Sequence, residues 1–248
     1  MILCGFAFLA GLMDAIAGGG GLILVPALFA VFPSAAPALL LGTNKMSSIA
    51  GTLVATLRYG WSVPIAWRKV LPASFWAGLG AFAGAKTVTL MDATVLRPVI
   101  VVMLVLVALY TILRQNFGAN PGHATLVRYE SLALPGLAAA IGFYDGFFGP
   151  GAGSFIIFGL VRWFGYDFLG ATAAAKVLNL ATNFGALVLF AATGNVMFLV
   201  AIPMAACSIA GALIGAQLAI ARGAPFIRAA FLFVVFALIA KLGWDLLH

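Results

Sequence analysis

Two lysines lie in apolar stretches of the chain where their charge would be far from bulk water. Lys45 stands about seven residues into the stretch 38–58, and Lys176 stands about eight residues into the stretch 168–192. A charged side chain at the centre of a membrane-spanning helix costs about 3 kcal/mol on insertion scales, so it indicates a functional site. Two roles are open for each lysine. It could bind an anion directly, or it could form a structural ion pair with a carboxylate.

The carboxylates that could pair with these lysines are Asp14 and Asp145. Each stands just before a glycine-rich break, 18–21 in the first case and 149–153 in the second. Three roles are open for the two aspartates. They could take up and release protons during transport, or hold a lysine as a counter-ion until substrate arrives. They could also accept hydrogen bonds from backbone N–H groups at a helix end.

The glycine breaks also predict helix starts within the apolar stretches. A helix N-terminus carries about half a positive charge, and in broken-helix transporters such ends point at anionic substrates. Two such starts, after Gly21 and after Gly153, would join the lysines in one electropositive pocket, although glycines also allow simple close packing of helices. Uncharged donors on the lysine-bearing stretches suit an oxyanion, and they equally hold membrane helices together. The predicted substrate site comprises Lys45, Lys176, Thr43, Asn44, Ser48, Asn179, Asn183, Gly20, Gly21, Gly151 and Gly153.

These residues recur at a constant offset of 131 positions, without a gap. The segment that ends at Asp14 matches the segment that ends at Asp145, and Lys45 matches Lys176. The offset also relates Pro72 to Pro203, Gly80 to Gly211, Gly84 to Gly215, and Arg97 to Arg228. A duplication this regular in a very apolar chain is typical of a transporter built from two repeats.

The composition predicts an integral membrane protein. Hydrophobic residues make up 65% of the 248 residues and charged residues 8%, whereas a soluble chain carries roughly 25% charged residues. The net charge of +7 comes largely from arginines at segment ends, where Lys and Arg set the orientation of membrane helices. With no basic run, nucleic-acid binding is excluded. Cys4 and Cys207 lie in apolar segments, so we expect no disulfide framework, and we expect no metal, cofactor or cleaved signal peptide.

The apolar pattern predicts an all-α fold of two repeats, each a broken hairpin followed by three spans. In the hairpins the pieces beside the glycines are too short to cross a hydrocarbon core of about 30 Å, so we expect them to be re-entrant. The first repeat, 1–114, has its hairpin at 1–33 and spans at 38–58, 70–90 and 95–113. A polar loop at 115–130 leads to the second repeat, 131–248, with its hairpin at 131–165 and spans at 168–192, 196–220 and 225–247.

The placement of positive charge then predicts the orientation of the repeats. The loop that contains Arg58, Arg68 and Lys69 should be cytoplasmic, while the matching loop at 192–195 has no charge and should face outward. The two repeats would therefore be inverted, provided that each hairpin returns to its own side. If each broken segment crossed the membrane instead, the repeats would be parallel.

The paired motifs resemble those of the sulfite exporter TauE/SafE family, also called the 4-toluene sulfonate uptake permeases. The first is GLMDAIAGGGGLILVPAL followed by GTNKMSSIAGT, and the second is GFYDGFFGPGAGSFIIFGL followed by ATAAAKVLNLATNF. The resemblance covers nearly the whole chain. It implies a multi-pass permease of the bacterial cytoplasmic membrane for sulfite, sulfoacetate or another organosulfonate. The motif positions carried over are Asp14, Gly18 to Gly21, Asn44, Lys45, Asp145, Gly149, Gly151, Gly153, Lys176 and Asn179.

The second motif departs from the first where Ala174 and Ala175 replace Thr43 and Asn44. A strictly symmetric set of ligands is therefore in doubt.

Taken together, these features favour a secondary transporter that holds a small anion between paired lysines and moves it by alternating access. An anion channel would share the same pocket, and a cation transporter could use Asp14 and Asp145. An enzyme is disfavoured because the two histidines, His123 and His248, stand in no catalytic motif. The bilayer is the expected environment. A homodimer could form through the Gly- and Ala-rich spans, although these residues could equally pack within one chain.

Overall fold

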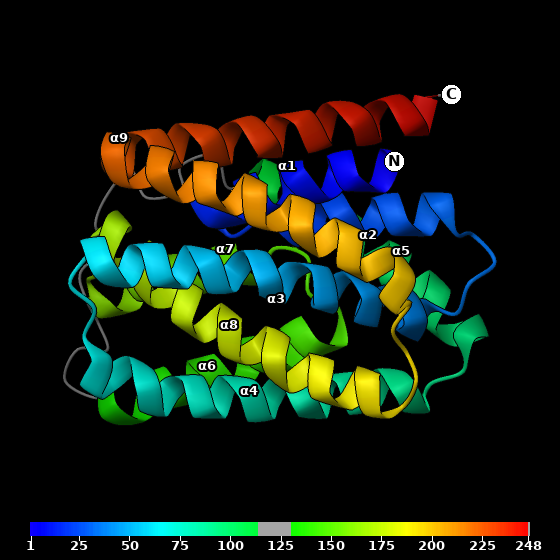
Figure 1. Cartoon of the computed structure of the whole chain (residues 1–248), viewed down its shortest axis with the longest axis horizontal. Coiled ribbons are helices and arrows are strands. Elements are labelled where there is room, and N and C mark those ends of the chain that lie inside the picture. Colours follow the sequence, from blue (N-terminus) through cyan, green and yellow to red (C-terminus); the bar gives the residue numbers. More distant parts are fainter. Residues whose placement is uncertain (114–129, 248) are drawn as a thin grey trace.

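Helices provide all the regular structure in the residues that the computed structural model describes, which are 1–113 and 130–247 (Figure 1). The predicted all-α fold is therefore confirmed for these residues. The loop predicted at 115–130 lies outside them, apart from Glu130. The helices are α1 (Ile2–Ala17), α2 (Gly20–Val31), α3 (Pro37–Ser62), α4 (Trp67–Leu90), α5 (Ala93–Leu113), α6 (Glu130–Phe147), α7 (Ala152–Phe164), α8 (Phe168–Ala192) and α9 (Phe198–Leu247).

The first glycine break separates α1 from α2, which form a hairpin. Gly18 has a φ of 75° and donates its N–H to the carbonyl oxygen of Asp14 at 2.8 Å. The chain then reverses, so that Leu3 and Leu28, from opposite ends of this segment, pack in one apolar cluster. In Figure 1 the chain enters α1 and leaves α2 at the same end of the bundle. With 16 and 12 residues, the two helices rise about 24 Å and about 18 Å.

The second break separates α6 from α7, and these helices also reverse the chain. Tyr166, which follows α7, donates its hydroxyl to the Glu130 carboxylate at the start of α6, at 3.0 Å. Lys69 near the start of α4 donates to the other carboxylate oxygen at 2.5 Å. The burial of Tyr166 and its contact with Glu130 raise the pKa of the Tyr166 hydroxyl. The beginning of α6 and the end of α7 therefore lie together, beside the start of α4.

Each hairpin packs against a helix from the other half of the chain. On α1, Gly11 lies against the backbone of Ser208 in α9, and on α6, Gly142 lies against the backbone of Ala77 in α4. At the offset of 131 residues, Gly142 corresponds to Gly11 and Ser208 corresponds to Ala77. Small residues allow membrane helices to approach this closely, and the same contact thus occurs twice at the offset seen in the sequence.

The two breaks meet near the centre of the molecule. A Cβ atom added to Gly18 would lie 2.5 Å from the carbonyl carbon of Gly153, and one added to Gly153 would lie 2.7 Å from the Cα of Gly18. Carbonyl groups at the broken end of α1 find donors on other helices, as buried helix ends require. The Ser154 hydroxyl donates to the Ala17 carbonyl at 2.8 Å, and the Tyr59 hydroxyl donates to the Ala15 carbonyl at 3.0 Å.

Long apolar helices surround the hairpins. Within the described residues, α8 and the Phe198–Gly223 arm of α9 are long and apolar enough to cross a membrane. At Gly223, with φ 68° and ψ −164°, α9 turns back, and its two arms run antiparallel (Figure 1). One side of α4 exposes large apolar side chains, which suits contact with lipid: Trp67, Leu71, Phe75, Trp76, Leu79 and Phe82.

The backbone contacts between α1 and α9 predict how single methyl groups affect stability. A Cβ at position 211 would collide with the carbonyl oxygen of Phe8. Gly211→Ala should therefore lower the free energy of unfolding by about 1–3 kcal/mol, as overpacking does. Nothing lies within 4 Å of a Cβ at Gly5 on α1. Gly5→Ala should thus leave stability unchanged or raise it by up to about 1 kcal/mol. Unfolding of each purified variant in detergent measures its free energy of unfolding. Equal changes for Gly211→Ala and Gly5→Ala would contradict the close backbone contact at Gly211.

Candidate functional site

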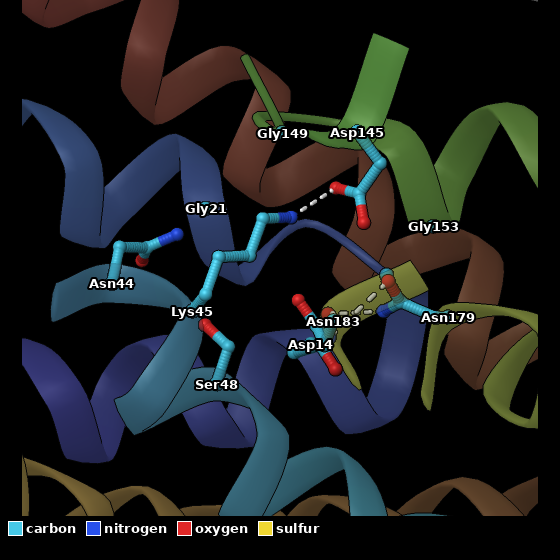
Figure 2. A pocket seen from close by; sticks show the side chains of 11 residues that line it. Asp14, Gly21, Asn44, Lys45, Ser48, Asp145, Gly149, Gly153, Asn179 and Asn183 are labelled. Atoms are coloured by element: carbon cyan, nitrogen blue, oxygen red, sulfur yellow. Dashed lines mark hydrogen bonds and ion pairs between the residues drawn. The ribbon is translucent and has the colours of Figure 1, made fainter. Parts of the chain in front are cut away.

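A polar cavity lies where the two glycine breaks meet (Figure 2). It holds about 280 Å³ of empty space, including its opening to solvent. Its wall combines the two breaks with side chains from α1, α3, α6 and α8. The lining residues are Asp14, Gly18, Gly21, Asn44, Lys45, Ser48, Asp145, Gly149, Gly153, Asn179 and Asn183.

On one side of the cavity Lys45 forms a buried ion pair with Asp145. The Nζ of Lys45 lies 2.8 Å from Oδ1 of Asp145, and the two side chains are 3% and 4% exposed. Asn44 and Ser48 flank the lysine on α3 (Figure 2). Two oxygens here accept no hydrogen bond from the described residues, namely Oδ2 of Asp145 and Oδ1 of Asn44.

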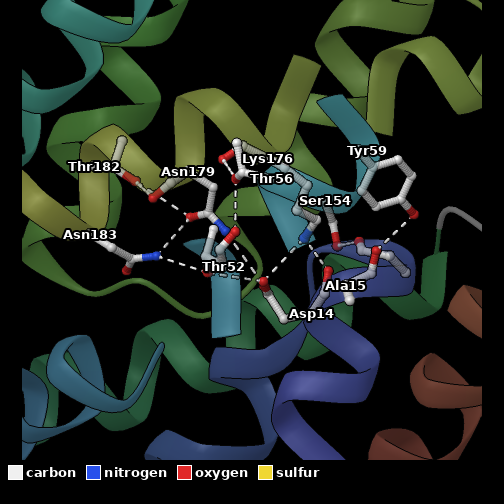
Figure 3. A network of polar contacts seen from close by, with 11 residues as sticks. Asp14, Ala15, Thr52, Thr56, Tyr59, Ser154, Lys176, Asn179, Thr182 and Asn183 are labelled. Carbon is white, nitrogen blue, oxygen red and sulfur yellow. Dashed lines mark hydrogen bonds and ion pairs between the residues drawn. The ribbon is translucent and has the colours of Figure 1, made fainter. Parts of the chain in front are cut away.

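On the other side of the cavity Lys176 pairs with Asp14 inside a denser network (Figure 3). Its Nζ lies 3.1 Å from Oδ2 of Asp14 and also donates to the main-chain oxygen of the same residue. The Asp14 carboxylate accepts two further hydrogen bonds, from the Thr52 hydroxyl at 3.3 Å and from the Asn179 amide at 3.4 Å. The network therefore provides donors to both carboxylate oxygens of Asp14.

The two ion pairs are related by the 131-residue offset and are crossed. Lys45 and Asp14 come from the first half of the chain, and their partners Asp145 and Lys176 come from the second. Between the pairs, the Asn183 amide donates to the Thr52 hydroxyl at 3.4 Å, and these residues are themselves 131 positions apart. Removing one partner of a buried pair leaves an uncompensated charge, so each pair ties the two halves together.

The structure brings most of the predicted site residues to the cavity wall. Nine line it: Asp14, Gly21, Asn44, Lys45, Ser48, Asp145, Gly153, Asn179 and Asn183.

Four predicted residues lie elsewhere. Lys176 is held by Asp14, and Gly20 packs against the carbonyl of Ala10. Gly151, with a φ of 81°, shapes the turn before α7. Thr43 donates to the Leu39 carbonyl at 2.6 Å and accepts from the Met197 N–H at 3.0 Å. We predicted the same role for both lysines, but only Lys45 faces the cavity.

Sequence reasoning passed over three residues that help to build the site. The Thr52 hydroxyl donates to Asp14. Thr52 corresponds to Asn183 at the offset of 131 residues, so the repeat could have identified it. The hydroxyl of Tyr144 donates to the carbonyl of Pro150 at 2.5 Å and fastens the second break. Thr56 donates to the Lys176 carbonyl at 3.1 Å. Tyr144 corresponds to Met13 and Thr56 corresponds to Leu187, so the repeat does not mark either hydroxyl.

The arrangement suits an anion better than a metal ion. The N-terminal turns of α2 and α7 begin at the cavity, where Gly21 and Gly153 form part of the wall. Exposed N–H groups and the helix dipole favour negative charge at such ends. The Lys45 ammonium adds a positive charge that becomes available to an anion when its contact with Asp145 is broken. Across residues 1–113 and 130–247, no three His, Cys, Asp or Glu side chains are grouped to hold a metal.

The whole chain is similar to known membrane proteins. The family model described as sulfite exporter TauE/SafE matches residues 3–242. The probable membrane transporter protein ORF9 of Sinorhizobium sp is 37% identical over 243 residues, which cover 98% of this chain and 91% of that protein. The probable membrane transporter protein YfcA of Escherichia coli K12 is 35% identical over 245 residues, covering 96% of this chain and 87% of that protein. No solved structure matches the chain significantly.

The Lys176 network predicts a difference between two lysine substitutions. Lys176→Ala would leave the Asp14 carboxylate in the protein interior without its cation, and should lower the free energy of unfolding by about 3–5 kcal/mol. Lys86→Ala removes an exposed lysine on α4 that forms no ion pair with the described residues. Its loss should cost about 0–1 kcal/mol, because no buried carboxylate depends on it. Unfolding in detergent compares the two, and similar losses would show that Lys176 contributes no more to stability than a surface lysine.

Proposed function

The chain belongs to the sulfite exporter TauE/SafE family of membrane transporters, and on this premise we propose that it carries a small sulfur-containing anion across the bacterial cytoplasmic membrane. The substrate class is sulfite or an organosulfonate such as sulfoacetate. The transport is secondary, driven by gradients rather than by nucleotide hydrolysis.

One observation carries this proposal: a buried lysine faces a cavity that two helix starts also face. Lys45 provides the positive charge, and the backbone N–H groups near Gly21 and Gly153 provide directed donors. Asn44 and Ser48 on α3 add an amide and a hydroxyl. The oxygens of a sulfite or sulfonate group accept hydrogen bonds from all of these donors, as oxyanions do at helix N-termini.

The anion competes with Asp145 for the lysine. In the structure the Asp145 carboxylate forms an ion pair with the Lys45 ammonium at 2.8 Å, an arrangement that the counter-ion hypothesis from the sequence expects. Substrate binding then replaces one carboxylate contact with a contact to the substrate. Lys176 has a supporting role, because it fixes Asp14 and with it the opposite wall of the cavity.

Alternating access follows from the proposed architecture of two inverted repeats. The twofold occurrence of the Gly11–Ser208 contact as Gly142–Ala77 supports this architecture, and so does the return of each hairpin to the end where it starts (Figure 1). The cavity lies between the hairpins, so movement of one half against the other would expose it to each side in turn. If the anion moves without a coupled ion, an inside-negative potential favours its export, at about 2.3 kcal/mol per charge per 100 mV.

The test is sulfite flux into proteoliposomes, with paired substitutions that leave no unpaired charge. Lys45→Gln combined with Asp145→Asn removes the ion pair at the cavity and should abolish saturable flux, because the binding cation is lost. Lys176→Gln combined with Asp14→Asn removes the equivalent pair in the supporting network. It should lower stability, yet the folded fraction should retain saturable flux.

Both double variants require a check that they fold, for which size-exclusion profiles and unfolding in detergent suffice. Full flux in the Lys45/Asp145 variant would overturn the proposed site. Flux that rises linearly with sulfite concentration in the wild type would replace the transporter with an anion channel. If neither sulfite nor an alkanesulfonate is transported, the proposed substrate class falls.

A further inference from the structure

The two paired aspartates differ in how well their carboxylates are satisfied. Asp14 binds Lys176, Thr52 and Asn179, so both of its oxygens have donors. Asp145 binds Lys45 through Oδ1, while its Oδ2 accepts no hydrogen bond within the described part of the chain. A buried acceptor without a donor is costly and requires a reason. Protonation of Oδ2 would turn this oxygen into a donor.

The charge balance of the cavity changes when an anion arrives. Lys45 and Asp145 together are neutral, and their side chains are 3% and 4% exposed. An anion that binds the Lys45 ammonium in place of Asp145 leaves this carboxylate without its cation. It also adds one net negative charge to a buried site. Such an uncompensated charge is strongly unfavourable. One proton on Asp145 restores neutrality.

Among the residues that the structure describes, no other charged group near Asp145 can take over this role. Lys176 on α8 is held by Asp14, and Asp14 on α1 lies across the cavity as a further negative charge. Tyr144 on α6 has its hydroxyl bound to the Pro150 carbonyl. On α4 the cations Arg68, Lys69 and Lys86 are exposed, and Lys69 binds Glu130 at the end of the bundle. Arg162 on α7 is also exposed.

We propose that Asp145 takes up one proton when the anion binds to Lys45, so that the protein moves a proton and the anion together. This inference rests on the proposed function and names its coupling ion. The proton comes from water and binds the Asp145 carboxylate, whose contact with the Lys45 ammonium is broken. The protonated carboxyl group can then donate to an oxygen of the bound anion. Asp14 keeps its three partners throughout the cycle.

Proton uptake on sulfite binding tests the proposal. Titration calorimetry of the full chain in detergent, repeated in buffers with different ionisation enthalpies, gives the number of protons bound per anion. The wild type should take up about one proton more than Asp145→Asn, as linkage requires. Sulfite itself exchanges protons with water, but this contribution is the same for both proteins and cancels in the difference.

Asp14→Asn is the matched control, because Asp14 is the repeat-related residue. Whatever affinity it retains, it should take up as many protons per anion as the wild type. If Asp145→Asn does not fold, infrared difference spectra of the wild type replace it. A band of a protonated carboxylic acid should then appear when methanesulfonate, which stays ionised, is added.

Two results would overturn the inference, and they are distinguishable. Equal proton uptake by the wild type and Asp145→Asn, or an absent carboxylic acid band with methanesulfonate bound, would remove proton coupling and leave the anion site intact. If the wild type binds neither sulfite nor methanesulfonate, the proposed function fails and the inference fails with it.

Discussion

The rest of the structure depends on two lysine–aspartate pairs, one buried and one partly buried, that cross between the halves of the chain. Each half provides one lysine and one aspartate, and neither lysine pairs with the aspartate of its own half. Buried charges are tolerated only when they are paired. The position of each hairpin relative to the opposite half is therefore coupled to the burial of four charges, and the cavity lies between these pairs.

The glycine breaks explain why the charges can meet at the centre. A continuous helix offers no free donors in its middle, whereas the starts of α2 and α7 present N–H groups inside the protein. The contact between Gly18 and Gly153 leaves no room for side chains. The end of α1 therefore lies close to the start of α7, and Asp14 and Asp145, which precede the two breaks, reach lysines on α8 and α3. Backbone geometry and electrostatics thus specify the same arrangement.

Much of this arrangement could be predicted because the informative residues occur twice. The all-α fold and the family follow from composition and from the paired motifs, and both are confirmed. The different surroundings of Lys45 and Lys176 could not be predicted, because they arise where the repeats have diverged. Asn44 corresponds to Ala175, and Ser48 corresponds to Asn179. The amide of Asn179 donates to Asp14, while the shorter Ser48 forms no such bond with Asp145 in the described structure. A repeat shows which positions correspond, but the side chains that have diverged decide which pair is fully bonded.

The crossed pairing also affects how the protein is made. Lys45 is synthesised 100 residues before Asp145, its partner in the folded protein. At about 5–20 residues per second, this interval is on the order of 5–20 s. During that time α3 carries a lysine whose partner in the folded protein does not yet exist. The interval is longer for Asp14, because its partner Lys176 follows it by 162 residues. The native pairing of Lys45 and Asp14 therefore has to follow synthesis of the second half.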